Sequence, residues 1–358
     1  MAVHFYRLPV KDIRKETEQC VSICFDIPPD LSEVFTYRAG QNITIRYDTP
    51  EGVIRRSYSI CSSPRDSEFR IAVKHLEGGI FSTYAHTRLQ TGDTLEVLAP
   101  TGSFTTAVDP GASRHYCFFA AGSGITPVIS LIKTLLLEEP KSQVTLFYGN
   151  RSVSSIIFKE QLEALKNRYM SRFSLTHLLS GEQTGSPLQQ GRIDAAKCRV
   201  LATLHDFKGA DAFFLCGPEG MIFTIRDFLE AMGVPPNKIH FELFTAPAQK
   251  TTVPFHPAKE PPAEGYAITV RADGLSHTFH LKDLRNNLLD AALEAGLDLP
   301  FSCKGGVCCT CKSKLLEGRV EMQSNYGLEP EELEAGFILT CQSHPLTQKV
   351  VIDFDARC

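Results

Sequence analysis

Four of the twelve cysteines place the tightest constraint on how this 358-residue chain can fold. Cys303, Cys308 and Cys311 form a C-x4-C-x2-C pattern, and Cys341 follows far downstream. Three thiolates this close in sequence can converge on one centre only from a tight loop, because a helix would splay them. The loop sequence FSCKGGVCCTCKSK contains two adjacent glycines, which let the backbone curl and direct its N–H groups towards sulfur. The sequence therefore predicts a metal centre held by a loop and one separate segment.

The spacing of these cysteines is that of plant-type [2Fe–2S] sites. A zinc site or a set of buried, inert thiols is the alternative, but zinc sites favour paired C-x2-C hooks and only one such pair is present. Cys309 lies in the same loop out of register, and we interpret it as a small packing residue. The other cysteines without metal-binding spacing, interpreted as filling space, are Cys20, Cys24, Cys61, Cys117, Cys198 and Cys358.

Two segments of different pattern precede the cysteine loop. Residues 1–108 contain the short apolar runs QCVSICFDI, QNITIRYDT, FRIAVKHL and TLEVLAP, separated by Gly, Pro, Asp and Ser. Many short strands without long helical patterns favour a small antiparallel β-barrel. Residues 112–245 instead alternate strand-like and helix-like runs, such as YCFFAA followed by VISLIKTLLLEE. That alternation predicts a doubly wound α/β domain with a parallel sheet.

The remainder of the chain divides into a linker and a C-terminal domain. Residues 246–264 contain five prolines and no periodic pattern, which predicts a semi-stiff linker. Residues 265–358 open with two strand candidates, AITVRAD and SHTFHL, and continue with the helical run NNLLDAALEAG before the cysteine loop.

A flavin site is predicted in the first segment. Arg56, Tyr58 and Ser59 form R-x-Y-S at a strand end. An arginine suits a pyrophosphate, a tyrosine can lie along the isoalloxazine, and a hydroxyl can hydrogen-bond the ring edge. Gly79 and Ser82 precede a short helical run whose N–H groups can bind phosphate. Taken singly, each residue also fits an ordinary barrel position, but together they indicate FAD.

Glycine turns in the second segment predict a nicotinamide dinucleotide site. Gly122 and Gly124, in AAGSGITP, lie between a predicted strand and helix, where they permit close backbone approach. Gly217 and Pro218, in LCGPEGM, close a later strand in the same way. Ligands of open α/β sheets bind at such carboxyl ends of strands.

The turn YGNRS bears on which nucleotide binds. Arg151 and Ser152 follow the strand directly, where the adenosine ribose is expected. A cation and a hydroxyl suit a 2′-phosphate, so we predict NADPH in preference to NADH. Lys159 and Arg192 are further candidates, and an exposed turn arginine without this role is the alternative.

Composition and charge exclude several classes of protein. Hydrophobic residues make up 43% and charged residues 22% of the chain, as in globular proteins, and we find no run of about 18 apolar residues that could span a bilayer. The N-terminus lacks an apolar signal core, so a cytoplasmic location with reduced thiols is expected. Residues 265–358 hold nine Lys/Arg and thirteen Asp/Glu, which accounts for the whole net charge of −4. The excess argues against nucleic acid and favours a basic protein partner, although a merely solvated acidic face is the alternative.

Taken in order, R-x-Y-S, GSGITP, YGNRS, CGPEGM and the cysteine loop resemble the ferredoxin–NADP reductase superfamily with a fused ferredoxin, over essentially the whole chain. FYGNRS, KGGVCCTCK, NYGLEPEELEAGFILTCQ and VVIDFDA most resemble the reductase subunits of ring 1,2-phenylacetyl-CoA epoxidases. The resemblance implies an FAD-binding barrel, an NAD(P)-binding α/β domain and an α+β ferredoxin domain of β-grasp type. It also implies a di-iron oxygenase of phenylacetate catabolism as electron acceptor, and another oxygenase or hydroxylase is the alternative.

The resemblance also implies roles for single residues. Ser59, Thr126 and Cys216 would act where hydride is transferred, and the last two would line the nicotinamide pocket. Phe244, in FELF, would lie against the flavin, although a core phenylalanine explains this position equally well. Cys309 departs from the family pattern, in which alanine or a similar small residue is expected.

These features predict an NAD(P)H-dependent flavin and iron–sulfur oxidoreductase that receives hydride and releases single electrons. The cofactors carry the redox chemistry and the protein positions them. The chain has no E-x-x-H pair of di-iron type, so the oxygen chemistry is expected in another component. A non-catalytic electron carrier and a cofactor-sensing regulator are the competing functions, and the second lacks a recognisable DNA-reading element. The predicted acceptor-docking face comprises Glu329, Glu331, Glu332 and Glu334.

Overall fold

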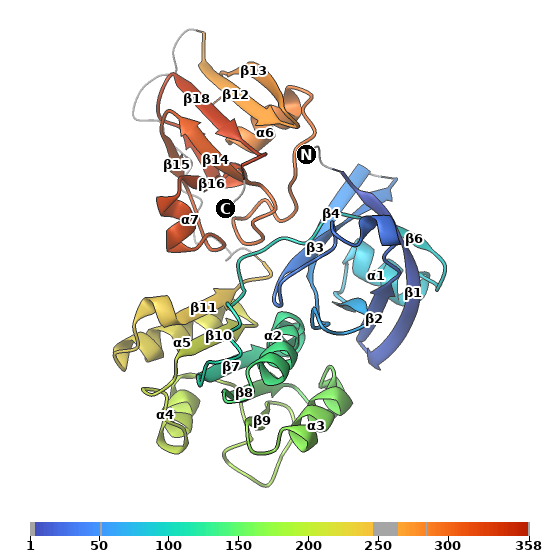
Figure 1. Cartoon of the computed structure of the whole chain (residues 1–358), viewed down its shortest axis with the longest axis vertical. Coiled ribbons are helices and arrows are strands. Elements are labelled where there is room, and N and C mark those ends of the chain that lie inside the picture. The colour runs from blue at the N-terminus through green and yellow to red at the C-terminus, as the bar shows by residue number, and fades with distance from the viewer. Residues whose placement is uncertain (1–3, 51, 246–263, 284, 357–358) are drawn as a thin grey trace.

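The computed structural model describes residues 4–50, 52–245, 264–283 and 285–356, and its elements group into three units (Figure 1). The predicted linker, apart from residue 264, and Cys358 lie outside these residues. None of the described helices is both long and apolar enough to cross a membrane.

The first unit is an antiparallel barrel, as predicted. Its six strands lie in the order β4-β3-β6-β1-β2-β5, and a bridge between Ile60 and Ile71 joins the two ends of the sheet. Leu8, Ile43 and Val73 belong to its buried interior. The elements are β1 (Tyr6–Thr17), β2 (Cys20–Phe25), β3 (Asn42–Thr49), β4 (Gly52–Ser59), β5 (Phe69–Lys74), α1 (Ile80–Thr87) and β6 (Thr94–Val97).

The second unit is a five-stranded parallel sheet in the order β11-β10-β7-β8-β9. The chain runs outward from β7 through β8 to β9 and then returns to the other side of β7, so the strand order reverses between β7 and β10. Ligands bind at such a reversal in open α/β sheets. The elements are β7 (His115–Ala121), α2 (Ile125–Glu138), β8 (Gln143–Asn150), α3 (Lys159–Arg168), β9 (Phe173–Leu179), α4 (Ala195–Leu204), β10 (Ala212–Cys216), α5 (Glu219–Ala231) and β11 (Ile239–Glu242).

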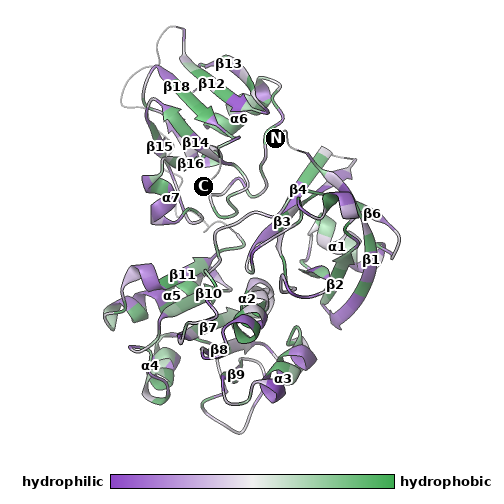
Figure 2. Cartoon of the chain, viewed as in Figure 1, coloured by the Kyte–Doolittle hydropathy of each residue, from purple (hydrophilic) through white to green (hydrophobic). Residues whose placement is uncertain are grey.

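The third unit is a mixed five-stranded sheet in the order β13-β12-β18-β14-β16, with α6 packed on it through Leu288 and Leu289. β12 and β18 are parallel, whereas the other pairs are antiparallel. Figure 2 shows apolar residues along the strands and polar residues on the outer helix α7. The elements are β12 (Tyr266–Ala272), β13 (Leu275–Leu281), α6 (Leu288–Glu294), β14 (Lys312–Glu317), β15 (Val320–Met322), α7 (Pro330–Glu334), β16 (Phe337–Leu339), β17 (Ser343–Pro345) and β18 (Lys349–Asp353).

The third unit packs against both of the others. Thr310, in the cysteine loop, hydrogen-bonds Thr44 of the barrel, with 3.3 Å between the hydroxyl oxygens. On the other side, the Tyr326 ring lies 6.4 Å from the Phe223 ring of α5, and Glu329 lies 3.9 Å from His240 of β11. The cysteine loop therefore lies where the three units meet.

Candidate flavin, nucleotide and iron–sulfur sites

The four predicted cluster ligands come together as two hydrogen-bonded pairs, Cys303 with Cys308 and Cys311 with Cys341. All but Cys303 are buried. Backbone N–H groups also point at sulfur: Gly305 donates to Cys303 at 3.3 Å, and the Cys303 amide donates to Cys308 at 3.5 Å. Four thiols grouped in pairs match the need of a [2Fe–2S] cluster, in which two irons share four thiolate ligands.

The loop reaches this shape through left-handed backbone positions. Lys304, Gly306 and Cys309 have φ values of +51°, +75° and +56°. A side chain at Gly306 would lie within about 3.0 Å of the Ser324 carbonyl, so glycine is required there for space as well as for φ. The predicted role of glycine in this loop is therefore visible in its geometry.

The protonation of the thiols also suits a metal ligand set. A hydrogen bond from the Cys308 thiol, helped by backbone N–H groups of Gly305 and Val307, lowers the pKa of Cys303 to about 6. A hydrogen bond from Cys311 likewise lowers the pKa of Cys341. One sulfur of each pair is thus easily ionised, and the thiolate is the form that binds metal.

Cys309 lies apart from the pairs, as the sequence interpretation expected. Its side chain packs beside Gly327, and a Cβ there would approach its sulfur too closely. Burial raises the pKa of Cys309, so its thiol stays protonated. This environment is that of a packing residue.

A carboxylic acid that the sequence analysis missed joins the α/β domain to the barrel, close to the cysteine loop. The Ser59 hydroxyl, at the end of β4, donates to a carboxylate oxygen of Glu242, at the end of β11, at 3.1 Å. Burial raises the pKa of Glu242 to about 8, and the neighbouring Cys308 also acts to raise it. At neutral pH the side chain is therefore mostly protonated. Only its place in FELF, directly after the last strand, could have suggested it.

The predicted flavin residues lie around β4 and α1. The Tyr58 ring packs 5.5 Å from the Phe81 ring of α1, and Arg56 is exposed on the same side of β4. The Ser82 hydroxyl accepts from the Leu76 amide at 3.2 Å, which fixes the loop before the helix. No side chain in the described ranges caps α1 at Gly79, so its first N–H groups can bind phosphate. These residues fit an FAD diphosphate, and their contacts to FAD remain predictions.

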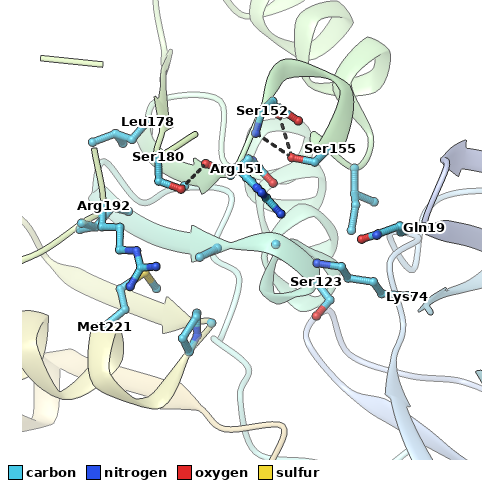
Figure 3. A pocket seen from close by; sticks show the side chains of 18 of the residues that line it. Gln19, Lys74, Ser123, Arg151, Ser152, Ser155, Leu178, Ser180, Arg192 and Met221 are labelled. Carbon is cyan, nitrogen blue, oxygen red and sulfur yellow. Dashed lines mark hydrogen bonds between the residues drawn. The ribbon is translucent and has the colours of Figure 1, made fainter. Parts of the chain in front are cut away.

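A cavity of about 1140 Å³ lies where the strand order reverses. Turns after β7, β8 and β10 line it, including the predicted Gly122, Gly217 and Pro218. The barrel contributes Gln19 and Lys74 from across the domain boundary (Figure 3). Nothing in the local sequence marks these two residues, because only domain packing brings them to the cavity.

Gly124 is not among the residues that line this cavity, although its neighbour Ser123 is. A Cβ on Gly124 would collide with the Cys216 carbonyl oxygen, and it would lie 2.8 Å from the Gly217 amide. The start of α2 therefore approaches the end of β10 as closely as backbone allows. The sequence analysis predicted instead a close backbone approach to a bound nucleotide at Gly124, and that role remains a prediction.

The predicted 2′-phosphate residues lie on one wall of the cavity. Arg151 and Ser152 follow β8, and the Ser152 amide donates to the Ser155 hydroxyl at 3.0 Å (Figure 3). Arg192 also lines the cavity. Within the described part of the chain, neither guanidinium group forms a side-chain hydrogen bond or ion pair. Lys159 lies elsewhere, 3.7 Å from Glu163 on α3.

Two predicted nicotinamide residues lie beneath the cavity. Thr126 and Cys216 are both buried, and neither is among the side chains that line the cavity. The Thr126 hydroxyl donates to the Ser123 carbonyl at 3.0 Å. Phe244, by contrast, lines the cavity and is 43% exposed, so it is not a core residue. The roles of all three towards the cofactors remain predictions.

Three domain families match this chain. An oxidoreductase FAD-binding domain matches residues 7–106, an oxidoreductase NAD-binding domain matches 118–227, and a 2Fe-2S iron-sulfur cluster binding domain matches 270–346. The last range contains all four paired cysteines, which decides between an iron–sulfur cluster and zinc.

Relatives match the chain over its whole length. One component of the 1,2-phenylacetyl-CoA epoxidase of Escherichia coli (strain K12) is 43% identical over 99% of this chain and 98% of its own. The chain belongs to the family of reductase components of oxygenases. The ferredoxin reductase component of 3-ketosteroid-9-alpha-monooxygenase from Rhodococcus rhodochrous is 35% identical over 97% of this reductase and 96% of its own length.

The fold agrees with this family. The structure of phthalate dioxygenase reductase superimposes with a TM-score of 0.58, at 24% identity, over 98% of both chains. The predicted fold class, FAD, the [2Fe–2S] cluster and a pyridine nucleotide are therefore confirmed. This reductase is an NAD(P)H-dependent flavin iron–sulfur oxidoreductase, which excludes the alternative functions of a mere electron carrier or a regulator.

Proposed function

We propose that this reductase prefers NADPH and delivers electrons to the oxygenase component of a ring 1,2-phenylacetyl-CoA epoxidase. The position of Arg151 carries the first half of the proposal. The identity to the Escherichia coli epoxidase component, over nearly the whole of both chains, carries the second half.

When bound, FAD accepts hydride from reduced nicotinamide and releases electrons singly, and the [2Fe–2S] cluster takes them one at a time. The chain's own residues then have three tasks. Arg56 and the uncapped start of α1 neutralise and orient the FAD diphosphate. The walls of the cavity hold the nucleotide, and the protonated Glu242 with Ser59 supplies a proton store at the junction.

The cationic wall supports NADPH. Arg151 has the hydroxyls of Ser152 and Ser155 beside it, and Arg192 lies in the same cavity. Glu18 and Asp194 also line the cavity, but Glu18 pairs with Lys15 at 2.8 Å and Asp194 caps α4. Three cations, Lys74, Arg151 and Arg192, thus line the cavity against two carboxylates, so the lining is net positive, as a 2′-phosphate requires.

The test is the Arg151→Ala variant. A hydrogen bond to a charged group contributes about 1.5–3 kcal/mol, so kcat/KM with NADPH should fall roughly 10- to 100-fold, while that with NADH changes little. Lys159→Ala is the matched control, because Lys159 lies outside the cavity. An equal loss with both nucleotides would refute the NADPH preference.

The face that receives the acceptor is proposed to include α7. Of the four predicted glutamates, Glu329 directly precedes α7 and contacts His240, and Glu332 binds Lys312 at 2.7 Å, so both already form contacts within the chain. Glu331 and Glu334 are exposed. We therefore narrow the acidic docking face to these two residues, next to the exposed Leu333.

The acceptor is tested by NADPH consumption with the purified oxygenase component of a phenylacetyl-CoA epoxidase, with and without phenylacetyl-CoA. Consumption that rises with the thioester supports the proposal. A cluster that NADPH reduces without any response to the thioester would point to another oxygenase. Glu331→Lys with Glu334→Lys should weaken delivery most at low salt, since exposed charges are screened. Unchanged delivery across salt concentrations would remove α7 from the docking face.

A further inference from the structure

One buried arginine connects the flavin strand to the ferredoxin domain. Arg55, in β4, is 8% exposed. Its guanidinium donates to the Leu299 carbonyl at 2.9 Å and to the Asp298 carboxylate at 2.8 Å. The same group lies 4.2 Å from the centroid of the Phe301 ring. All three of these partners belong to the segment that leads into Cys303.

Arg55 lies in the same strand, β4, as the predicted flavin residues. Successive side chains of a strand point to opposite faces. Arg56 and Tyr58 lie on the side of the predicted flavin, whereas Arg55 and Ser57 face the other way. The hydroxyl oxygen of Ser57 lies 3.1 Å from that of Thr44. The Thr44 hydroxyl also hydrogen-bonds Thr310 of the cysteine loop. A single strand thus presents one face to the flavin site and the other to the cluster loop.

The chemistry of the contact makes it specific. A planar guanidinium that donates in two directions and stacks on an aromatic ring accepts only one relative orientation of its partners. A buried cation without partners is strongly destabilising, so a shifted ferredoxin domain would leave Arg55 in an unfavourable state. Asp298 is 62% exposed, which means that solvent screens the ion pair and that the carbonyl and ring contacts carry much of the orientation.

We propose that Arg55 is a positioning residue for electron transfer from flavin to cluster. It fixes the segment 298–301, and through it Cys303, against the strand that carries Arg56 and Tyr58. Interfaces between domains of one chain resemble transient protein–protein interfaces, so an orienting contact is needed to keep the two redox sites close. Electron-transfer rates fall steeply with distance, and a loosened domain therefore slows this step alone.

The experiment follows both cofactors in the full-length holoprotein. Wild type and Arg55→Met are mixed anaerobically with NADPH, and flavin bleaching and cluster reduction are timed separately by absorption and by EPR of rapidly frozen samples. Because the orienting contact is lost, we expect cluster reduction to be slowed about tenfold or more, with flavin reduction within about twofold of wild type. Arg55→Lys keeps the positive charge but loses the planar guanidinium that donates in two directions. Its rate of cluster reduction should therefore lie between those of the wild type and Arg55→Met.

Matched variants separate positioning from folding. Arg46 of β3 lies opposite Arg55 of β4 in the strand register. Its ion pairs, with Glu96 at 3.4 Å and Asp48 at 3.8 Å, stay within the barrel. Arg46→Met should leave cluster reduction unchanged, and Asp298→Ala, on the ferredoxin side, should slow it by less than Arg55→Met does. Wild-type cluster reduction in Arg55→Met would overturn the proposal, as would equal slowing of flavin and cluster. These readouts do not depend on the acceptor, and NADH can replace NADPH if it reduces the flavin faster.

Discussion

The cluster loop and the nucleotide cavity prepare for their ligands in opposite ways. In the loop, Cys308, Cys311 and Cys341 are buried, and the sulfurs already receive hydrogen bonds from thiols and amides. In the cavity, Arg151 and Arg192 are both exposed, and neither has a side-chain partner among the described residues. A group that remains bound can be enclosed, whereas a substrate that leaves after each turnover needs an open site with charges free to meet it.

We expect the largest effect when a ligand is removed from the enclosed site, the cluster loop. Cys308→Ser removes one thiolate from the first pair, and we expect complete loss of the [2Fe–2S] cluster while NADPH still reduces the flavin. Iron content and EPR of the reduced protein measure the cluster. Cys309→Ala is the matched control in the same loop, and it should retain iron, because Cys309 packs beside Gly327 and away from the pairs. Iron loss in that control would contradict the assigned ligand set.

A smaller effect tests the open site through the backbone contact at Gly124, next to the cavity. Gly124→Ala places a methyl group against the Cys216 carbonyl, so the start of α2 must move away from β10. Overpacking of this kind costs about 1–3 kcal/mol, and the affinity for NADPH should fall roughly 5- to 100-fold. Titration with NADP⁺, followed by the flavin spectrum, measures it.

Gly220 provides the control for this prediction. It lines the cavity, but a Cβ there meets no heavy atom of the described structure within 4 Å. Gly220→Ala should therefore bind the nucleotide like wild type. Equal losses in both variants would show that the cavity tolerates no added methyl group, and that the close approach at Gly124 has no special importance.

The last effect concerns the junction between the two sites and depends on pH. The folded-state pKa of Glu242, about 8, lies above its ordinary value of 4.5, so folding favours the protonated form. The stability that this form provides is fully present below pH 4.5 and is lost as pH rises towards 8. The loss is at most about 1.4 kcal/mol per pH unit.

Thermal unfolding of the holoprotein measures this loss. Between about pH 5 and pH 8 the melting temperature of the wild type should fall more steeply than that of Glu242→Gln, which cannot ionise. Identical slopes for both proteins would mean that Glu242 titrates normally.

The sequence allowed the local features to be predicted. The cluster ligands are confined to one loop plus Cys341, and their spacing is itself a property of the chain. The α/β domain was recognisable because its central strands are apolar throughout; residues 116–120 of β7, for example, are all buried. β1 was missed because its pattern YRLPVKDIRKET is mostly polar, and only Leu8 and Val10 are buried.

The features that the sequence did not reveal depend on contacts between domains. Lys74 of the barrel reaches the nucleotide cavity, Glu242 of the α/β domain reaches Ser59, and Arg55 reaches Leu299 of the ferredoxin domain. Each pair joins residues far apart in the chain, and local sequence patterns do not predict such contacts. The four glutamates in and directly before α7 show the same limit, because two of them, Glu329 and Glu332, form contacts within the chain.

The two-sided strand β4 also limits how modular this molecule is. Fused redox domains can be recombined by protein engineering. A foreign ferredoxin could be attached at the linker without disturbing the fold of the ferredoxin or of the reductase domains. In such a chimera Arg55 would lose its partners unless the new ferredoxin also placed a carbonyl, a carboxylate and an aromatic ring where residues 298–301 now lie. A one-residue deletion inside β4 would be worse, because it would exchange the two faces of the strand. Shuffling should therefore succeed only when β4 and the segment before the cluster loop are transplanted together.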